Sequence, residues 1–379
     1  MKRVLAFFLS VFVFCNVASG AQYRAVLVAD MDSGRVLYQE NANQLNYPAS
    51  LTKIMTLYLT FDALEHKRLR LDDYLIVSQY AADAQPVKLG LTAGSKIKVE
   101  DAIKAVAVHS ANDVARVLAE NLKGGKEGNF ASLMTRVANE IGLKNTNFEN
   151  SSGLPNDDHM STARDIALLS MAVYKHFPQY WKYFGIKTWT YNGKTYTNGN
   201  RLLGSYPGCD GMKTGFTNKS RYSLVATAGR DGRHLMAVVL GAENKDVRAS
   251  VATKMLNLGF NKIGGGQTDY APMPVNVQTE AVNQNNPLAK YAQDYQSYES
   301  PQSVSYKSGK AGVQFGAFSS VESAKNQVAR VKSAIGVDAK IERNDAGLYR
   351  VRVVGLSESD ATKIKNLAVA NGLDCYIFH

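Results

Sequence analysis

The sequence predicts a mixed α/β chain of the α+β kind, with a larger N-terminal domain, a polar linker and a small βαββαβ domain. In the larger domain, residues 23–38 and 222–227 alternate as β-strands do, and residues 235–240 form an apolar run. Apolar residues recur at helical spacing after Ser50. Beyond residue 309, a strand pattern followed by a helix pattern occurs twice. With 379 residues, 45% of them hydrophobic, the chain is long enough for two folded domains.

The first 20 residues have the composition of a secretory signal peptide. Lys2 and Arg3 precede an apolar run at 4–17, and small residues follow at 18–21. The run is too short to span a bilayer, which takes about 20 residues. The pattern therefore predicts a signal peptide over residues 1–20 and an exported, soluble protein without a transmembrane anchor after cleavage.

Charge and residue spacing disfavour several classes of function. The formal charge is +11, or +9 without Lys2 and Arg3. For an exported protein this favours an anionic polymer or membrane surface over nucleic acid, although solubility alone explains it equally well. The six histidines form no His-x-His or His-Glu-x-x-His pattern, which disfavours a zinc peptidase. We expect no metal and no cofactor. Cys209 and Cys375 lie in different predicted domains, so no disulfide framework is expected.

The larger domain is organised around residues 47–55, Tyr-Pro-Ala-Ser-Leu-Thr-Lys-Ile-Met. Pro48 suits the approach to a helix, and the apolar periodicity that follows predicts a helix beginning near Ser50. Residues three apart share a helix face, which brings the Ser50 hydroxyl to the Lys53 amine. A serine becomes a good nucleophile when a base takes its proton, and a lysine whose pKa is lowered by burial can be that base.

The spacing alone is weak evidence, because Ser-x-x-Lys recurs at Ser95 and Lys98. The alternation there predicts a strand, on which side chains three apart point to opposite faces. A polar residue at a helix start would explain Ser50 equally well if no later motif accompanied it.

A second motif interrupts a helical stretch at 99–108, where Ser110-Ala111-Asn112 precedes another helix. This arrangement exposes a hydroxyl and a carboxamide on a tight loop. The Asn112 amide can hold a substrate amide through both its donor and its acceptor. A helix break with an N-cap is the alternative interpretation.

A third motif, Lys213-Thr214-Gly215, lies within residues 208–217 and is followed by further strands. On an edge strand it would supply a fixed charge, a hydroxyl and a glycine that lets a substrate backbone come close. Edge strands also bind extended peptides by strand addition.

The three motifs, in this order and at these intervals, resemble those of penicillin-binding proteins and serine β-lactamases. Residues 47–56, 142–148, 153–154, 161–165 and 208–217 narrow the resemblance to the low-molecular-mass D-alanyl-D-alanine carboxypeptidases. The similarity implies a penicillin-binding-protein/β-lactamase-like transpeptidase fold, an antiparallel sheet flanked by helices plus a helical lobe.

The resemblance, which covers roughly residues 23–262, also implies a catalytic mechanism. Ser50 would attack the carbonyl of the penultimate D-alanine in a peptidoglycan stem peptide, and Lys53 would accept its proton. Ser110 and Lys213 would relay a proton to the departing D-alanine. Water would then hydrolyse the acyl-enzyme.

Substrate-binding roles are implied in the same way. Asn112 would hold the acyl-side amide, and Thr214 would bind the terminal carboxylate. The backbone N–H groups of Ser50 and Phe216 would form the oxyanion hole. Arg248 is a candidate for carboxylate binding, although an exposed salt bridge explains it equally well.

The leading interpretation is an exported serine D,D-carboxypeptidase that β-lactam antibiotics inhibit. A D,D-endopeptidase or transpeptidase using the same site is an alternative, whereas the absence of a class A type Glu-bearing loop disfavours a β-lactamase. An inactive wall-binding scaffold would be expected to lack one of the motif residues, and Ser50, Lys53, Ser110 and Lys213 are all present.

Residues 264–308 are rich in Gln, Asn, Ser and Pro, which predicts a flexible linker between a catalytic domain at 21–263 and a C-terminal domain at 309–379. Residues 313–318 and 349–353 resemble the SPOR domain, a ferredoxin-like βαββαβ module. That resemblance implies binding to glycan strands of peptidoglycan, and many SPOR proteins are directed to the division septum.

A four-stranded sheet with both helices on one face leaves its other face free for a ligand. Gln314, Tyr349 and Arg352 are predicted glycan contacts on or beside that face. RNA-binding modules share the layout, but the aromatic RNP motif is absent and export argues against nucleic acid. We therefore expect a secreted or periplasmic protein associated with the cell wall.

Overall fold

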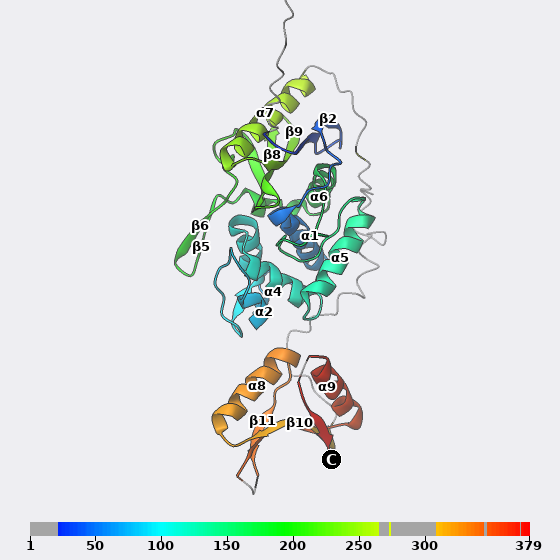
Figure 1. Cartoon of the computed structure of the whole chain (residues 1–379), viewed down its shortest axis with the longest axis vertical. Helices are drawn as coiled ribbons and strands as arrows, with labels where there is room; N and C mark the ends of the chain where they lie inside the picture. The colour runs from blue at the N-terminus through cyan, green and yellow to red at the C-terminus, as the bar shows by residue number, and fades with distance from the viewer. Residues whose placement is uncertain (1–21, 265–272, 274–307, 345–346, 372) are drawn as a thin grey trace, which may run out of the picture. The chain divides into compact units, whose positions relative to one another are not determined.

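The computed structural model describes residues 22–264, 273, 308–344, 347–371 and 373–379. The predicted signal peptide and nearly all of the predicted linker lie outside these residues (Figure 1). The described residues fall into two units, the first within 1–55 and 134–280 and the second within 56–133 and 281–379.

The first unit is built on an antiparallel five-stranded sheet with the order β2-β1-β9-β8-β7. The strands are β1 (Ala25–Asp30), β2 (Val36–Glu40), β7 (Cys209–Thr217), β8 (Arg221–Arg230) and β9 (Arg233–Ala242). The predicted N-terminal hairpin is confirmed as β1 and β2. Strand β7, which carries Lys-Thr-Gly, is an edge strand as predicted.

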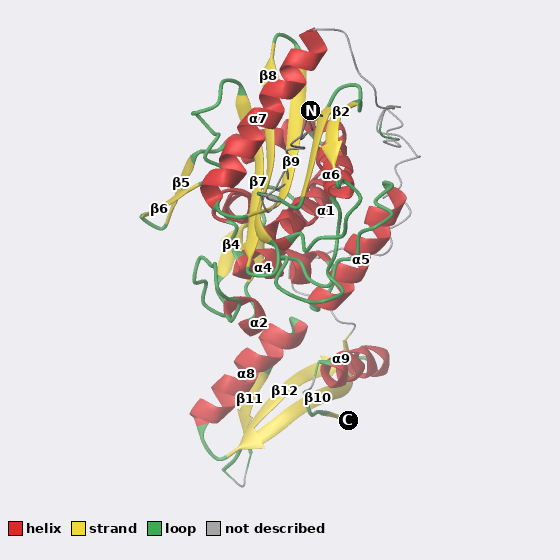
Figure 2. Ribbon diagram, turned by 45° about the horizontal axis from the view of Figure 1, so that its top comes forward, coloured by secondary structure: helices red, strands yellow, loops and turns green. Residues whose placement is uncertain are grey.

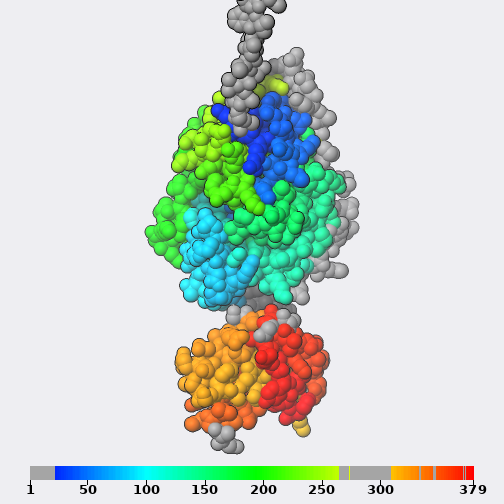
Figure 3. Space-filling view, in the orientation of Figure 1, coloured from blue at the N-terminus to red at the C-terminus, as the bar shows by residue number. Residues whose placement is uncertain are grey.

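Helices flank this sheet, which is why its inner strands are apolar on both faces (Figure 2). Helix α7 (Lys245–Gly264) packs Ala252 and Leu256 on the face that contains Val28 and Ala237. Helix α6 (Ala163–His176) contacts β1 and β9. In Figure 3, blue residues from the start of this unit border green and yellow residues of 220–260, as the pairing of β1 with β9 requires.

The remaining elements around this sheet are short. They are the 3₁₀ helix η1 (Ala49–Thr52), the 3₁₀ helix η3 (Pro178–Gly185), and a two-stranded hairpin of β5 (Thr188–Tyr191) and β6 (Lys194–Thr197). The chain also forms the longer helices α1 (Lys53–Glu65) and α5 (Glu127–Glu140).

The second unit contains the predicted helical lobe. Its elements are β3 (Tyr74–Ile76), α2 (Gln79–Ala82), β4 (Lys96–Lys98), α3 (Val99–Lys104), the single π-helical turn η2 (Ala105–His109) and α4 (Asn112–Leu122). The second Ser-x-x-Lys sequence runs into strand β4, as predicted. Its Lys98 pairs with Asp72.

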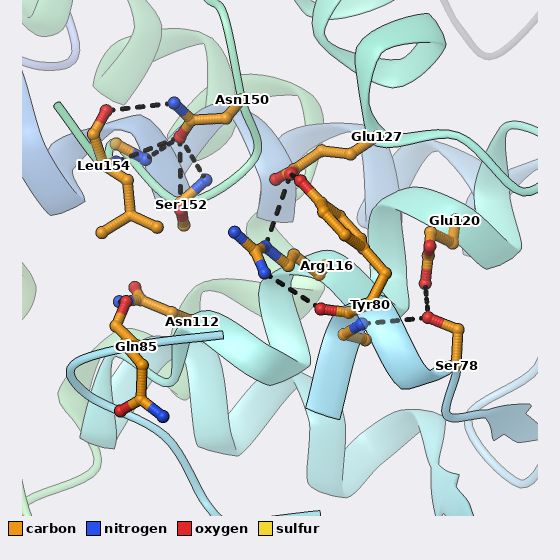
Figure 4. A network of polar contacts seen from close by, with 12 residues as sticks. Ser78, Tyr80, Gln85, Asn112, Arg116, Glu120, Glu127, Asn150, Ser152 and Leu154 are labelled. Carbon is orange, nitrogen blue, oxygen red and sulfur yellow. Dashed lines mark hydrogen bonds and ion pairs between the residues drawn. The ribbon is translucent and has the colours of Figure 1, made fainter. Parts of the chain in front are cut away.

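Polar contacts hold helices α2, α4 and α5 of the lobe together (Figure 4). Arg116 donates to the Tyr80 carbonyl at 2.9 Å and pairs with Glu127 at 3.5 Å. The Tyr80 hydroxyl donates to the same Glu127 carboxylate at 2.6 Å. Ser78 caps α2 and donates to Glu120. Because these polar groups are matched to partners on neighbouring helices, they favour one arrangement of the lobe over its alternatives.

The C-terminal part has the predicted βαββαβ order, with an antiparallel sheet in the order β11-β12-β10-β13. Its elements are β10 (Ser308–Phe318), α8 (Val321–Ile335), β11 (Lys340–Arg343), β12 (Tyr349–Leu356), α9 (Glu358–Ala370) and β13 (Tyr376–Phe378). Ser320 and Ser357 cap the two helices through their hydroxyls. Val313, Phe315 and Val351 face a core completed by α8 and α9.

Across the described parts of the chain, the helices are too short or too polar to cross a bilayer.

Candidate active site

The turn that carries Ser50 is held in an uncommon backbone conformation. Ala49, the residue before it, has a φ of 48°, a value that non-glycine residues adopt at a cost. The chain then makes the 3₁₀ turn η1 and enters α1 at Lys53, so the predicted helix start near Ser50 is confirmed. A methyl group on Gly153 would lie 1.7 Å from the Ala49 carbonyl oxygen, so only glycine fits beside this turn.

Ser50 and Lys53 meet as the sequence predicts. Lys53 Nζ lies 3.0 Å from Ser50 Oγ and donates to the Ser152 carbonyl at 2.6 Å. The Lys53 side chain is fully buried. When the lysine is neutral, the same separation lets the serine hydroxyl donate its proton to Nζ.

Ser152, which the sequence analysis did not single out, is positioned by Asn150 (Figure 4). The Asn150 side-chain oxygen accepts from the backbone N–H groups of Ser152, Gly153 and Leu154 at 2.7–3.2 Å, and its amide donates to the Leu154 carbonyl at 3.0 Å. This Asx-type turn aims the Ser152 carbonyl at Lys53. The sequence signal for it is Asn-Ser-Ser-Gly at 150–153, since each of these residues favours turns.

A second residue missed from the sequence is His159. Its Nδ1 accepts from the Glu149 N–H at 3.2 Å, so in the neutral imidazole Nε2 donates to Thr52 Oγ1, 2.8 Å away. Burial, and then the nearby Lys53, lower the pKa of His159 to about 4. A neutral imidazole therefore supports the turn that joins Ser50 to Lys53.

We expect His159 to make the folded state sensitive to acid. The pKa of His159 is about 4 in the folded protein and 6.5 in its ordinary, exposed state. Between pH 4 and pH 6.5 the unfolded chain therefore binds a proton at this residue that the folded protein does not. The stability from this group is complete above pH 6.5 and is lost as the pH falls towards 4, by roughly 3 kcal/mol. Urea unfolding of wild type and His159→Gln at pH 4–7 measures it. Equal pH slopes for the two proteins would contradict the prediction.

Strand β7 presents the third motif beside the Ser50 turn. A methyl group on Gly215 would lie 3.1 Å from the Pro48 oxygen and 3.3 Å from the Ser50 nitrogen. The absence of a side chain at Gly215 therefore makes room for the Ser50 turn. The sequence pattern predicts only that this glycine makes room for a substrate backbone. Lys213 is buried, whereas the Phe216 side chain is 49% exposed and its ring stacks obliquely on Tyr222.

The electrostatics of Lys213 suit a group that changes protonation near neutrality. Burial, and then the positive charge of Arg248, lower its pKa to about 7. At neutral pH the amine is thus divided between its charged and neutral forms, which suits proton transfer.

We expect this pKa to appear in the pH profile of the reaction. If protonated Lys213 attracts a carboxylate and delivers a proton, kcat/KM should fall about tenfold per unit above pH 7. Lys213→Arg keeps its charge at these pH values, so that decline should disappear although the maximum is lower. Steady-state rates from pH 6 to 9 measure both profiles, and a flat wild-type profile would exclude the assignment.

Arg248 lies near the start of α7 and is buried, so the alternative of an exposed salt bridge is wrong. Its guanidinium donates to the carbonyls of Ser223 and Gly199 at 3.4 and 3.3 Å, and burial lowers its pKa to about 10. A methyl group on Gly199 would lie 2.8 Å from Thr214 Oγ1, so the loop that Arg248 contacts also adjoins Thr214. The Arg248 guanidinium and the Thr214 hydroxyl thus both lie beside the loop that contains Gly199.

The N-terminal half of β7 is anchored through Asp210. Its carboxylate accepts from Thr227 Oγ1 at 2.7 Å and Trp181 Nε1 at 2.8 Å, and lies 3.0 Å from His234 Nε2. Burial acts to raise the pKa of Asp210, but these contacts outweigh it and hold the pKa below its ordinary value. The adjacent Cys209 is a free, half-buried thiol whose pKa is raised by burial, in keeping with a packing role.

Ser110 and Asn112 lie in the second unit. Ser110 takes a left-handed conformation with φ 64° that ends the π-helical turn, so the predicted helix break is confirmed. The N-cap alternative is not, because Ala111 occupies that position and no side chain caps α4. Asn112 Nδ2 donates to the Gln85 carbonyl at 2.8 Å, and its backbone N–H donates to the Val87 carbonyl at 2.7 Å.

In the C-terminal sheet, Gln314 and Arg352 are directly paired across β10 and β12, and Arg352 Nε donates to Gln314 at 2.6 Å. They alternate with the core residues Val313 and Val353, so they face away from the helices. Tyr349 lies on the opposite face of β12 from Arg352, the same face as Val351 and Val353, and packs against their core cluster. Contrary to the prediction, it therefore lies on the helix side of the sheet and not on the open face.

Comparison with known proteins agrees with this arrangement. Residues 16–244 match the peptidase S11 family model, D-alanyl-D-alanine carboxypeptidase, and residues 307–378 match the SPOR domain. The chain belongs to this carboxypeptidase family, and its C-terminal part is a SPOR domain.

Two curated relatives and one solved structure define the similarity. D-alanyl-D-alanine carboxypeptidase DacC of Escherichia coli is 38% identical over 64% of this chain, and DacF of Bacillus subtilis is 34% identical over 63%. The chain spans 62% of the length of each. Penicillin-binding protein D2 of Listeria monocytogenes, solved in an ampicillin-bound form, is 32% identical with a TM-score of 0.58, over 63% of this chain and 98% of that one.

Proposed function

We propose that the protein is an exported serine-type D-alanyl-D-alanine carboxypeptidase that removes the terminal D-alanine from peptidoglycan stem peptides. The observation that carries the proposal is the 3.0 Å contact between Ser50 Oγ and Lys53 Nζ in a turn closed off from solvent on the lysine side. A nucleophile paired with a buried amine is the arrangement that acyl transfer through a serine requires.

The proposed reaction begins with attack of Ser50 Oγ on the carbonyl carbon of the penultimate D-alanine, while Lys53 accepts the hydroxyl proton. The backbone N–H groups of Ser50 and Phe216 stabilise the resulting oxyanion. The C–N bond then breaks, and Lys213 with Ser110 supplies a proton to the departing D-alanine nitrogen. Water hydrolyses the acyl ester and regenerates Ser50.

Substrate selection is proposed to depend on the C-terminal carboxylate. Thr214 would donate to it, and the charges of Lys213 and Arg248 would attract it. Buried cations favour an anion strongly because little water screens them. Asn112, on the N-terminal side of α4, would hold the amide of the acyl portion.

The proposed organisation is a signal peptide at 1–20, a catalytic domain at 21–263, a linker at 264–308 and a glycan-binding domain at 309–379. In a cell with an outer membrane this places the enzyme in the periplasm, where the last domain would keep it on the wall. The family match over residues 16–244 and the SPOR match over residues 307–378 support the two folded domains of this arrangement.

The test is to incubate the purified protein with a stem pentapeptide and with a cross-linked peptide dimer. We expect one D-alanine released per pentapeptide and one equivalent of bound fluorescent penicillin. Cleavage of the dimer at a comparable rate would favour the endopeptidase alternative. A folded protein that releases no D-alanine and takes no label would overturn the proposal.

We also expect Arg352→Ala in the full chain to weaken binding to purified sacculi severalfold. The guanidinium lies on the open sheet face, where it contacts Gln314 and Glu342 and lies over the Phe378 ring. Sedimentation with sacculi measures the bound fraction, and Lys332→Ala on α8 is the matched control. Equal binding by both variants would reject this face as the glycan site.

A further inference from the structure

Three residues near the Ser50 turn come from segments that each carry part of the proposed site. Tyr47 lies three residues before Ser50, Asp157 follows the Ser152–Leu154 loop, and Lys219 lies three residues after Phe216. All three belong to the first unit.

These side chains contact one another. Lys219 Nζ forms an ion pair with the Asp157 carboxylate and lies 5.4 Å from the centroid of the Tyr47 ring. The Tyr47 hydroxyl donates to the same Asp157 oxygen at 3.3 Å. The partnership lowers the pKa of Asp157 and raises the pKa of Lys219. The three residues are called the rim cluster below.

Each member is held by its own segment. Thr217 and Ser220 exchange hydrogen bonds at 2.8–3.0 Å that close the turn carrying Lys219, whose carbonyl also accepts from Arg24 at 2.9 Å. On the Asp157 side, the N–H of His159 donates to the Asn156 carbonyl at 3.2 Å. The cluster therefore joins three ordered turns.

We propose that the rim cluster is a positioning device that fixes the separation of the Ser50 and Phe216 backbone N–H groups. Tyr47 leads directly into the Ser50 turn, and Lys219 closes the hairpin end that follows Phe216. Linking both to Asp157 fastens strand β7 to the Ser50 turn on the solvent side. On the buried side, Gly215 of the same strand already lies close to that turn. The inference rests on the proposed oxyanion role of these two N–H groups.

The expected effect is modest and specific. Asp157 and Lys219 are 79% and 52% exposed, so their pairing contributes little to global stability. An oxyanion forms only in the transition state, so a loosened pair of donors should lower the acylation rate constant and leave the initial binding constant unchanged.

The experiment measures acylation of the full-length protein by a fluorescent penicillin, separated into a binding constant and an acylation rate constant. The variants are Lys219→Ala, Asp157→Ala and the exchanged pair Asp157→Lys with Lys219→Asp. Lys332→Ala is the control, because Lys332 forms a comparably exposed pair with Asp338 in the SPOR domain. Thermal unfolding is recorded for every variant.

We expect each single variant to acylate about threefold to fivefold more slowly with unchanged binding, and the exchanged pair to recover most of the loss. Molar salt should slow the wild type but not the single variants, because it screens the ion pair. Single variants as fast as the control, or an exchanged pair as slow as the single variants, would overturn the inference alone. A wild type that takes no label would overturn the inference and the proposed function together.

Discussion

Ser50→Ala is expected to abolish covalent labelling by penicillin and to reduce D-alanine release to the background rate. The substitution removes the only atom at this position able to form the acyl ester. Loss of a covalent nucleophile typically costs about 10⁴-fold or more in turnover. Intact-mass spectrometry of the protein after incubation with penicillin measures the adduct directly.

Ser95→Ala is the matched control, since Ser95 begins the other Ser-x-x-Lys sequence but precedes strand β4. It should acylate as the wild type does. The small side chain at position 50 should also leave the unfolding temperature nearly unchanged, because Ser50 is only half-buried. A Ser50→Ala protein that still gains the penicillin mass would remove Ser50 from the mechanism.

Lys53→Met is expected to slow acylation by about 10²–10⁴-fold, the range for a lost general base. Methionine has a similar length and suits an apolar site, so this variant should fold. It leaves the Ser152 carbonyl without the donor that lies 2.6 Å away, and a loss of about 1–3 kcal/mol in stability is expected from that.

Lys53→Arg separates charge from basicity. A guanidinium keeps the positive charge but cannot give up its proton near neutrality, so this variant should be as slow as Lys53→Met. Stopped-flow acylation compares the two, with Lys98→Met as the control from the second Ser-x-x-Lys sequence. Wild-type rates in Lys53→Arg would mean that charge alone, and not proton acceptance, is required at this position.

Local pattern was enough to predict the elements that carry the motifs. Lys-Thr-Gly, which precedes strand patterns at 222–227 and 235–240, was expected on an edge strand, and helical spacing after Ser50 placed Lys53 one turn away on the same face. Both expectations depend only on residues close in the sequence, where backbone periodicity fixes side-chain direction. The βαββαβ order of the SPOR domain followed from the same kind of evidence, because its strands and helices alternate without long insertions.

Contacts between distant residues were beyond such patterns. Lys53 meets the Ser152 carbonyl and Thr52 meets His159 across about 100 residues of chain, and nothing periodic links these positions. The burial of Arg248 depends on how α7 lies on β8, and the side taken by Tyr349 depends on which face of β12 the helices cover. These contacts and orientations can be known only from the packed structure.

Two glycines lie against the Ser50 turn, Gly153 beside Ala49 and Gly215 beside Pro48 and Ser50. Under the proposed function, this restricts the routes by which penicillin resistance could evolve. A larger residue at either glycine would displace the proposed nucleophile from peptide substrate and β-lactam alike. Selection for antibiotic escape should therefore act on outward-facing residues such as Phe216, which can change without moving the nucleophile.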